Sequence, residues 1–146
     1  MSRKYPKQPI IGVGVVVVKD NRVLVIQRGK EPGAGSWAFP GGRLELGETL
    51  ADAAVREALE ETGLTVKPGD VIAVIDLIDR DETGNIRYHY VVIDLLAQLI
   101  SGAPRPGDDS VAVRWIGLQE AEELPMAPRM VDVVRQLLGD RDAQHD

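Results

Sequence analysis

The chain has no cysteine among its 146 residues. Disulfides and thiolate metal sites are therefore excluded, and a reducing compartment is permitted. Aromatic residues make up only 4% of the chain, so few rings are available for stacking on a nucleobase. Whatever the chain binds, it must rely mainly on polar and charged groups.

Long apolar runs are also missing. No stretch approaches the roughly 18 residues that a membrane-spanning helix needs. The basic MSRKYPK followed by PIIGVGVVVV has the outline of a secretory signal, but Lys19 and Asp20 end the run without a small-residue cleavage site. We interpret the run as a buried strand and expect a cytoplasmic protein that does not bind membranes. The net charge of -6 disfavours stable binding to nucleic acids as well.

The length and a hydrophobic content of 44% are consistent with one core. We expect a single domain over 1–146, with flexible ends at 1–8 and 139–146. Strands before and after a central helix, with a second helix at the end, predict an α/β fold with a mixed β-sheet. The expected strands are 10–18, 22–28 (joined to the first as a hairpin), 71–78, 86–99 and 111–116, and the second helix is expected over 126–138.

The segment 42–64, GRLELGETLADAAVREALEETGL, places three glutamates on one face of the central helix. Glu57, Glu60 and Glu61 are related by steps of three and four residues, so their charges converge. Each pair costs about 0.2–0.5 kcal/mol, and the carboxyl end of the helix dipole adds to that cost. A divalent cation would reverse the sign. Oxygen ligands without cysteine or nearby histidine favour Mg²⁺ or Mn²⁺, and Mg²⁺ is commonly shared with substrate phosphates.

The ends of this helix are marked by local signals. Thr49 is a good N-cap, and Gly63 can adopt the left-handed conformation beyond the last turn. Val55, Leu59 and Thr62 lie opposite the glutamates on the helical wheel, so we expect them to face the core.

Small residues lie on the glutamate side of the helix. Ala53 and Ala54 leave room there for another backbone, so we expect the loop 41–47 to fold against them. A backbone carbonyl of Gly41 or Gly42 would then add an oxygen ligand for a cation.

The same segment resembles the Nudix box, G-x5-E-x7-R-E-U-x-E-E-x-G-U, in which U is a bulky aliphatic residue. Only Ala58 departs from this pattern, because it is apolar but small. The preceding WAFPGG also resembles the lead-in to that box. The matching positions are Gly42, Glu48, Arg56, Glu57, Glu60, Glu61, Gly63 and Leu64.

The resemblance implies the Nudix fold, an α/β/α sandwich with the box beside the sheet. It also implies hydrolysis of a nucleoside diphosphate linked to another moiety, by attack of water on phosphorus, with Mg²⁺ or Mn²⁺ as cofactor. Glu57, Glu60 and Glu61 are the implied metal ligands together with Gly42, and one of the glutamates is a candidate to deprotonate water.

Two further box residues are candidate catalytic residues. Arg56 lies one turn before Glu60 and could orient a carboxylate; the alternative is a surface ion pair worth about 0.3–0.5 kcal/mol. Glu48 precedes the N-cap, where it could favour the positive end of the helix or contact a second metal through water.

Substrate contacts are sought outside the box. Arg28 and Lys30 could meet phosphate, or they could belong to an ordinary polar loop. A further acidic residue could come from Asp108 or Asp109, or from Glu82, although acids are common in turns. The candidate substrate-binding residues are Arg28, Trp37, Phe39, Tyr88 and Asp109.

The substrate class remains open at this stage. One group of ADP-ribose hydrolases in the family carries a proline downstream of the box. This chain has Asp79 and Arg80 near that position and lacks the proline, so ADP-ribose and a nucleoside triphosphate both stay candidates. A homodimer is left open. Two other functions are considered: a nucleotide sensor without turnover, and a calcium-binding structural domain, for which no EF-hand loop is present.

Overall fold

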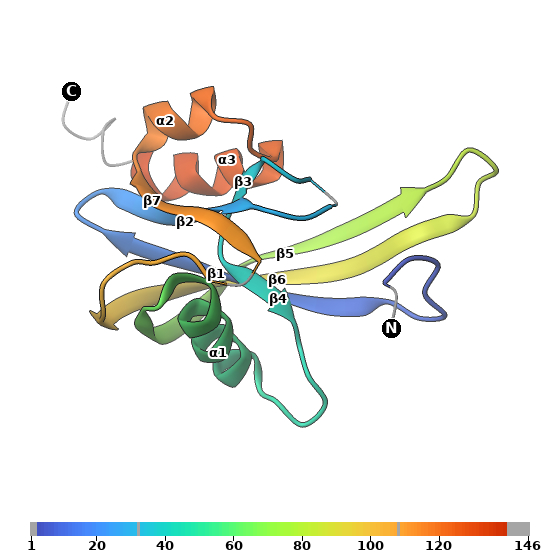
Figure 1. Cartoon of the computed structure of the whole chain (residues 1–146), viewed down its shortest axis with the longest axis horizontal. Coiled ribbons are helices and arrows are strands. Elements are labelled where there is room, and N and C mark those ends of the chain that lie inside the picture. Colours follow the sequence, from blue (N-terminus) through green and yellow to red (C-terminus); the bar gives the residue numbers. More distant parts are fainter. Residues whose placement is uncertain (1–2, 32, 108, 140–146) are drawn as a thin grey trace.

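The structure is a computed structural model, and it describes residues 3–31, 33–107 and 109–139. In this part of the chain seven strands form one sheet, with helices on both of its faces (Figure 1). The strands are β1 (Ile10–Lys19), β2 (Arg22–Arg28), β3 (Trp37–Ala38), β4 (Gly41–Arg43), β5 (Thr65–Arg80), β6 (Ile86–Ser101) and β7 (Ser110–Ile116); the helices are α1 (Leu50–Thr62), α2 (Leu118–Glu123), α3 (Pro128–Val134) and the π-helical turn η1 (Arg135–Gly139).

The sheet is mixed, as the sequence predicts. Its order is β3-β2-β1-β6-β5, with β4 also paired to β1 and β7 to β2. The central strand β1 runs parallel to β6, whereas the other pairs are antiparallel. With α1 on one face and α2 and α3 on the other, the predicted α/β/α sandwich is confirmed (Figure 1).

The β1–β2 hairpin is confirmed together with its turn. Asp20 and Asn21 both have positive φ, at 52° and 58°. Two such residues make the mirror-image turn that matches the twist of paired strands. The strand residues next to the turn pair as Lys19 with Arg22.

Two hydrophobic layers lie on opposite faces of the sheet. Because side chains alternate along a strand, Val13, Val15 and Val17 of β1 pack with the buried alanines of α1. Val16 faces the other way and packs with residues of α2, α3 and η1. The second layer also contains the buried side chains of Val23, Val25, Trp37, Phe39, Ile116, Ala121, Val133, Val134 and Leu138.

The strands β5 and β6 form a hairpin of sixteen residues on each side, longer than the sequence predicts. It projects beyond the body of the molecule (Figure 1). Val74 and Ile78 are exposed on this hairpin. Asp81 organises its tip by accepting hydrogen bonds from the backbone of Thr83 and Asn85.

Some elements differ from the sequence expectations. The short elements β3, β4 and α2 are not predicted, since two to six residues carry too weak a pattern. The expected helix over 126–138 begins at Pro128, where proline suits the first helical position, and it ends in the π-helical turn. None of the helices in the described part of the chain has the length and apolar composition to cross a bilayer.

Candidate active site

Helix α1 has the ends that the sequence predicts. The Thr49 side chain accepts a hydrogen bond from the backbone N–H of Asp52 at 3.0 Å. Gly63 has a φ of 75° and donates its backbone N–H to the carbonyl of Leu59. Both caps satisfy backbone groups that a helix end leaves without partners. They therefore determine where the helix of the box begins and ends.

The rotation of α1 differs from the expectation. Leu59 was expected to face the core, but it is 48% exposed, and Val55 is only partly buried. The expectation for Thr62 was right, because its side chain is buried. The small side chains of Ala53 and Ala54 are buried instead, since they let the helix approach the sheet closely. This rotation turns two of the box glutamates toward the protein.

Arg56 lies at the centre of a network of hydrogen bonds. Its Nε and Nη2 donate to the two oxygens of Glu48 at 2.7 and 2.9 Å. Its Nη1 donates to Glu57 Oε1 at 2.7 Å, and Nη2 also donates to the backbone carbonyl of Arg43 at 3.0 Å. The paired guanidinium lowers the pKa of Glu48 to about 2. Arg56 therefore contacts two box carboxylates, which is the arrangement that an orienting role would need.

Glu57 and Glu61 approach the same pair of glycines. The Glu57 carboxylate lies against Gly42, where even a methyl group would overlap it. Gly41 donates its backbone N–H to Glu61 Oε2 at 3.0 Å. The start of the expected loop therefore lies against α1, at the glutamates, whereas Leu46 further along is fully exposed, so the expectation for 41–47 holds only in part. Gly41 also contributes an N–H, which was not expected.

Burial disfavours the charged form of both carboxylates. It raises the pKa of Glu57, and it raises the pKa of Glu61 to about 7, with the charge of Glu57 adding to the effect on Glu61. A hard cation between such groups would stabilise their ionised forms. The donor chemistry at this corner therefore fits a magnesium or manganese ion.

Glu60 is placed differently from the other two glutamates. Its side chain is 58% exposed, and its closest cationic atom is Arg56 Nη1 at 3.4 Å. Within the described residues, no three acidic or histidine side chains come together closely enough to hold one ion. The structure thus brings Glu57 and Glu61 together and leaves Glu60 at the rim of the site.

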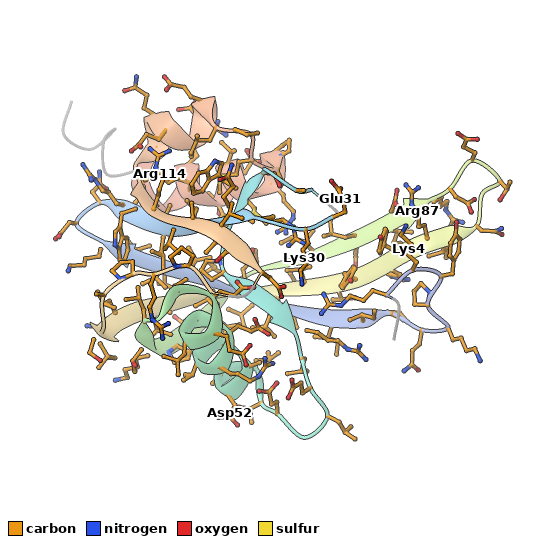
Figure 2. The ribbon with its side chains drawn as sticks, viewed as in Figure 1. Lys4, Lys30, Glu31, Asp52, Arg87 and Arg114 are labelled. Atoms are coloured by element: carbon orange, nitrogen blue, oxygen red, sulfur yellow. The ribbon has the colours of Figure 1, made fainter. Side chains whose placement is uncertain are left out.

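A second segment closes the carboxyl end of α1. Ser110 Oγ and the backbone N–H of Gly107 both donate to the carbonyl of Glu61, at 3.2 and 3.0 Å. Asp109 pairs with Lys30 at 2.8 Å, and Lys30 extends from the loop after β2 (Figure 2). The pKa of Glu61 is lowered by the charge of Arg28 and raised by that of Asp109. These three predicted residues therefore lie near the box.

The predicted aromatic residues do not gather at this site. Trp37 and Phe39 are buried in the core, at 8% and 5% exposure, so little of either ring is open to a ligand. Tyr88 lies on the projecting hairpin and stacks on Tyr90, with 6.4 Å between ring centroids. Glu82 lies in the turn between β5 and β6. The tip of this hairpin is far from α1 (Figure 1). Asp108 lies outside the described residues, as do 140–146 of the expected flexible tail.

A family model of the NUDIX domain matches residues 8–137, which is most of the chain. The chain belongs to the Nudix hydrolase family. Membership implies a small nucleotide-like substrate, and Nudix enzymes typically depend on a divalent metal.

Individual relatives agree with this assignment. An ADP-ribose pyrophosphatase from Methanocaldococcus jannaschii is 36% identical over 116 residues, which are 80% of this chain and 66% of that protein. The crystal structure of a MutT NUDIX hydrolase from Burkholderia pseudomallei is 35% identical with a TM-score of 0.69, covering 77% of this chain and 86% of that one. The crystal structure of a NUDIX hydrolase from Nitrosomonas europaea is 28% identical with a TM-score of 0.75, covering 94% and 74%.

Several groups at the Nudix box were not found from the sequence. The backbone carbonyl of Arg43 and the N–H of Gly41 carry no side-chain signal, although the adjacent glycines pointed to a close backbone approach. Ser110 had no signal at all, because it reaches Glu61 only through the pairing of β2 with β7.

Proposed function

We propose that this Nudix hydrolase cleaves the pyrophosphate bond of a nucleoside diphosphate linked to another group, by attack of water on phosphorus. Mg²⁺ is the proposed cofactor, and Mn²⁺ is expected to support the same reaction in its place. The observation that carries the proposal is the approach of two carboxylates, the buried Glu57 and the partly buried Glu61, to the Gly41–Gly42 backbone. Two adjacent anions with raised pKa values are suited to a site that a dication completes.

Each box residue has a role in this proposal. Glu57, Glu60 and Glu61 would hold the metal, with the carbonyl of Gly42 as a further oxygen. Such an ion neutralises phosphate charge and lowers the pKa of a bound water. Arg56 fixes the Glu57 carboxylate through its 2.7 Å bond, and its bidentate contact with Glu48 keeps the guanidinium itself in place.

The proposed substrate is ADP-ribose or a nucleoside triphosphate. The name of the Methanocaldococcus jannaschii relative supports the first. Arg28 and Lys30 border the site on the side of Glu61, where their charge can attract the phosphates of either substrate. Asp109 is proposed as the additional acidic residue at this border.

The test is hydrolysis of a nucleotide panel that includes ADP-ribose and the four nucleoside triphosphates, with Mg²⁺ and with chelator. We expect metal-dependent release of a nucleoside monophosphate or of pyrophosphate. Glu60→Gln should abolish most turnover and leave the melting temperature unchanged, because its side chain is largely exposed.

Glu122→Gln is the matched control, since this exposed glutamate on α2 pairs with Arg135 at 3.6 Å and lies outside the box. It should leave turnover unchanged. An unaltered rate for Glu60→Gln at saturating Mg²⁺ would remove Glu60 from the mechanism. Binding of nucleotides without any turnover would contradict the proposed reaction and favour a sensor.

A further inference from the structure

Asp94 in β6 is a buried carboxylate, and one of its oxygens, Oδ2, has no hydrogen-bond partner among the described residues. It is 1% exposed, and its Oδ2 lies 3.6 Å from Nη1 of Arg129 in α3. Both atoms are buried and have no hydrogen-bond partner among the described residues. Ion pairs of this kind contribute little to stability unless further hydrogen bonds satisfy them. The pair therefore calls for an explanation other than stability.

The position of Asp94 is built into the sheet. It pairs with Gly14 of β1, and a methyl group at Gly14 would overlap Asp94 Oδ1. The carboxylate thus occupies space that only glycine leaves open in the neighbouring strand. This close fit holds Asp94 beneath Arg129.

The pair lies within reach of the Nudix box. Gly14 is also opposite Gly41 of β4, so Asp94, Gly14 and Gly41 form one row across three strands. Adjacent strands are about 4.8 Å apart, which puts Asp94 about 10 Å from Gly41. Gly41 in turn binds Glu61. In the described residues β4 pairs only with β1, so a ligand can extend over its free edge.

The surface beside Asp94 suits a flat, apolar ring. Val92 and Tyr90 share its face of β6, because alternate residues of a strand point to the same side. Both side chains flank Gly12, which adds no side chain of its own. Tyr90 is partly exposed and stacks with Tyr88. An aromatic ring lying on this surface would have Arg129 near its edge.

We propose that Arg129, positioned by Asp94, donates hydrogen bonds to the acceptor edge of the substrate's nucleobase and so sets base selectivity. Nη1 is the atom of Arg129 that approaches Asp94, and the Arg129 side chain is 22% exposed. A guanidinium has five N–H donors, so others can serve a ligand. With the phosphates at the glutamates, the group that reaches Arg129 is the end of the nucleotide remote from the cleaved bond. This inference rests on the proposed function.

The test measures binding of AMP, GMP, CMP, UMP and pyrophosphate by calorimetry with Mg²⁺, and hydrolysis of the four nucleoside triphosphates and ADP-ribose. Arg129→Met should weaken the best-bound monophosphate about tenfold or more and reduce the preference among bases. Pyrophosphate, which has no base, should bind within about twofold of the unaltered chain.

Three further variants separate recognition from folding. Arg129→Lys keeps a charge above Asp94 but lacks the planar fork, so it should remain folded and lose selectivity. Asp94→Asn should raise KM more than it lowers kcat, because Arg129 loses its positioning group. Asp132→Asn is the matched control on α3, where its partner is Arg135, and it should change neither quantity.

The inference is overturned if folded Arg129→Met and Arg129→Lys keep the base preference, or if pyrophosphate binding weakens as much as nucleotide binding. It is also overturned if the unaltered chain binds none of the monophosphates. Mg²⁺-dependent hydrolysis with unchanged selectivity in these variants would remove this inference and leave the proposed function standing. Monophosphate binding that depends on Arg129, without hydrolysis of any nucleotide, would support this inference and contradict the proposed reaction.

Discussion

Gly41 and Gly42 are adjacent residues that we expect to respond differently to the same substitution. The three atoms nearest to a methyl group at Gly42 all belong to the Glu57 carboxylate, the end of a side chain that can change its rotamer. Gly42→Ala should therefore fold normally and lose roughly a hundredfold in activity through a misplaced carboxylate. The measurements are the free energy of unfolding and kcat.

Gly41→Ala is the matched comparison. Its methyl group would meet the backbone of Val13 and Gly14, which cannot move aside. We expect a loss of about 1–3 kcal/mol in the free energy of unfolding. Equal stability losses for the two variants would contradict this reading of the site.

The pairing of Glu48 with Arg56 predicts that the free energy of unfolding depends on pH in the acidic range. The pKa of Glu48 is about 2 in the folded chain, below its ordinary value of 4.5. The contribution of the ionised group is therefore complete above about pH 4.5 and is lost as the pH falls toward 2. The difference in free energy of unfolding between the unaltered chain and Glu48→Gln should shrink from pH 6 to pH 3. A constant difference across that range would show that the ion pair is not its source.

For individual residues, the sequence predicted the kind of site more successfully than it predicted which residues are in contact. The spacing of Glu57, Glu60 and Glu61 was enough to indicate a cation site, because helical geometry alone puts them on one arc. It could not show that Glu60 faces solvent, since that depends on how the helix is rotated against the sheet. Asp94 gave no signal, because one acid inside an apolar strand has meaning only beside Gly14 and Arg129.

The elements were predictable where local groups determine them. The cap residues of α1 and the turn of the β1–β2 hairpin satisfy their own backbone, so they can be read from a few neighbouring residues. The rotation of α1 is set by tertiary packing, which favoured the buried alanines over Leu59. For the same reason β3 and β4 could not be predicted: strands of two and three residues exist only because β2 and β1 offer them partners.

The N-cap residue of α1, Thr49, is expected to contribute to the stability of the helix. Thr49→Ala removes the side chain that accepts the N–H of Asp52. We expect the free energy of unfolding to fall by about 1 kcal/mol in denaturant titrations. Thr49→Ser keeps a hydroxyl and should lose much less. Equal losses for both variants would point to packing of the Thr49 methyl group instead.

The whole molecule combines a buried body with a projecting hairpin, and the two parts should differ in stability. The far end of β5 and β6 is at most partly buried, whereas Val15, Val16 and Val17 of β1 are fully buried. Because sparsely buried regions open with lower free energy, backbone amides near Ile78 and His89 should exchange with deuterium much faster than those of Val15 and Leu95. Similar protection in both places, measured by mass spectrometry or NMR, would show that the hairpin is held by contacts other than its own.

The parallel pairing of β1 with β6 also governs how this protein is made. Val15 pairs with Leu95, which is synthesised roughly eighty residues later in the chain. At a synthesis rate of about 5–20 residues per second, the partner emerges ~4–16 s afterwards. Throughout that interval the valine-rich first strand has no sheet neighbour on its second side, so the newborn chain is most vulnerable to aggregation before its sixth strand leaves the ribosome.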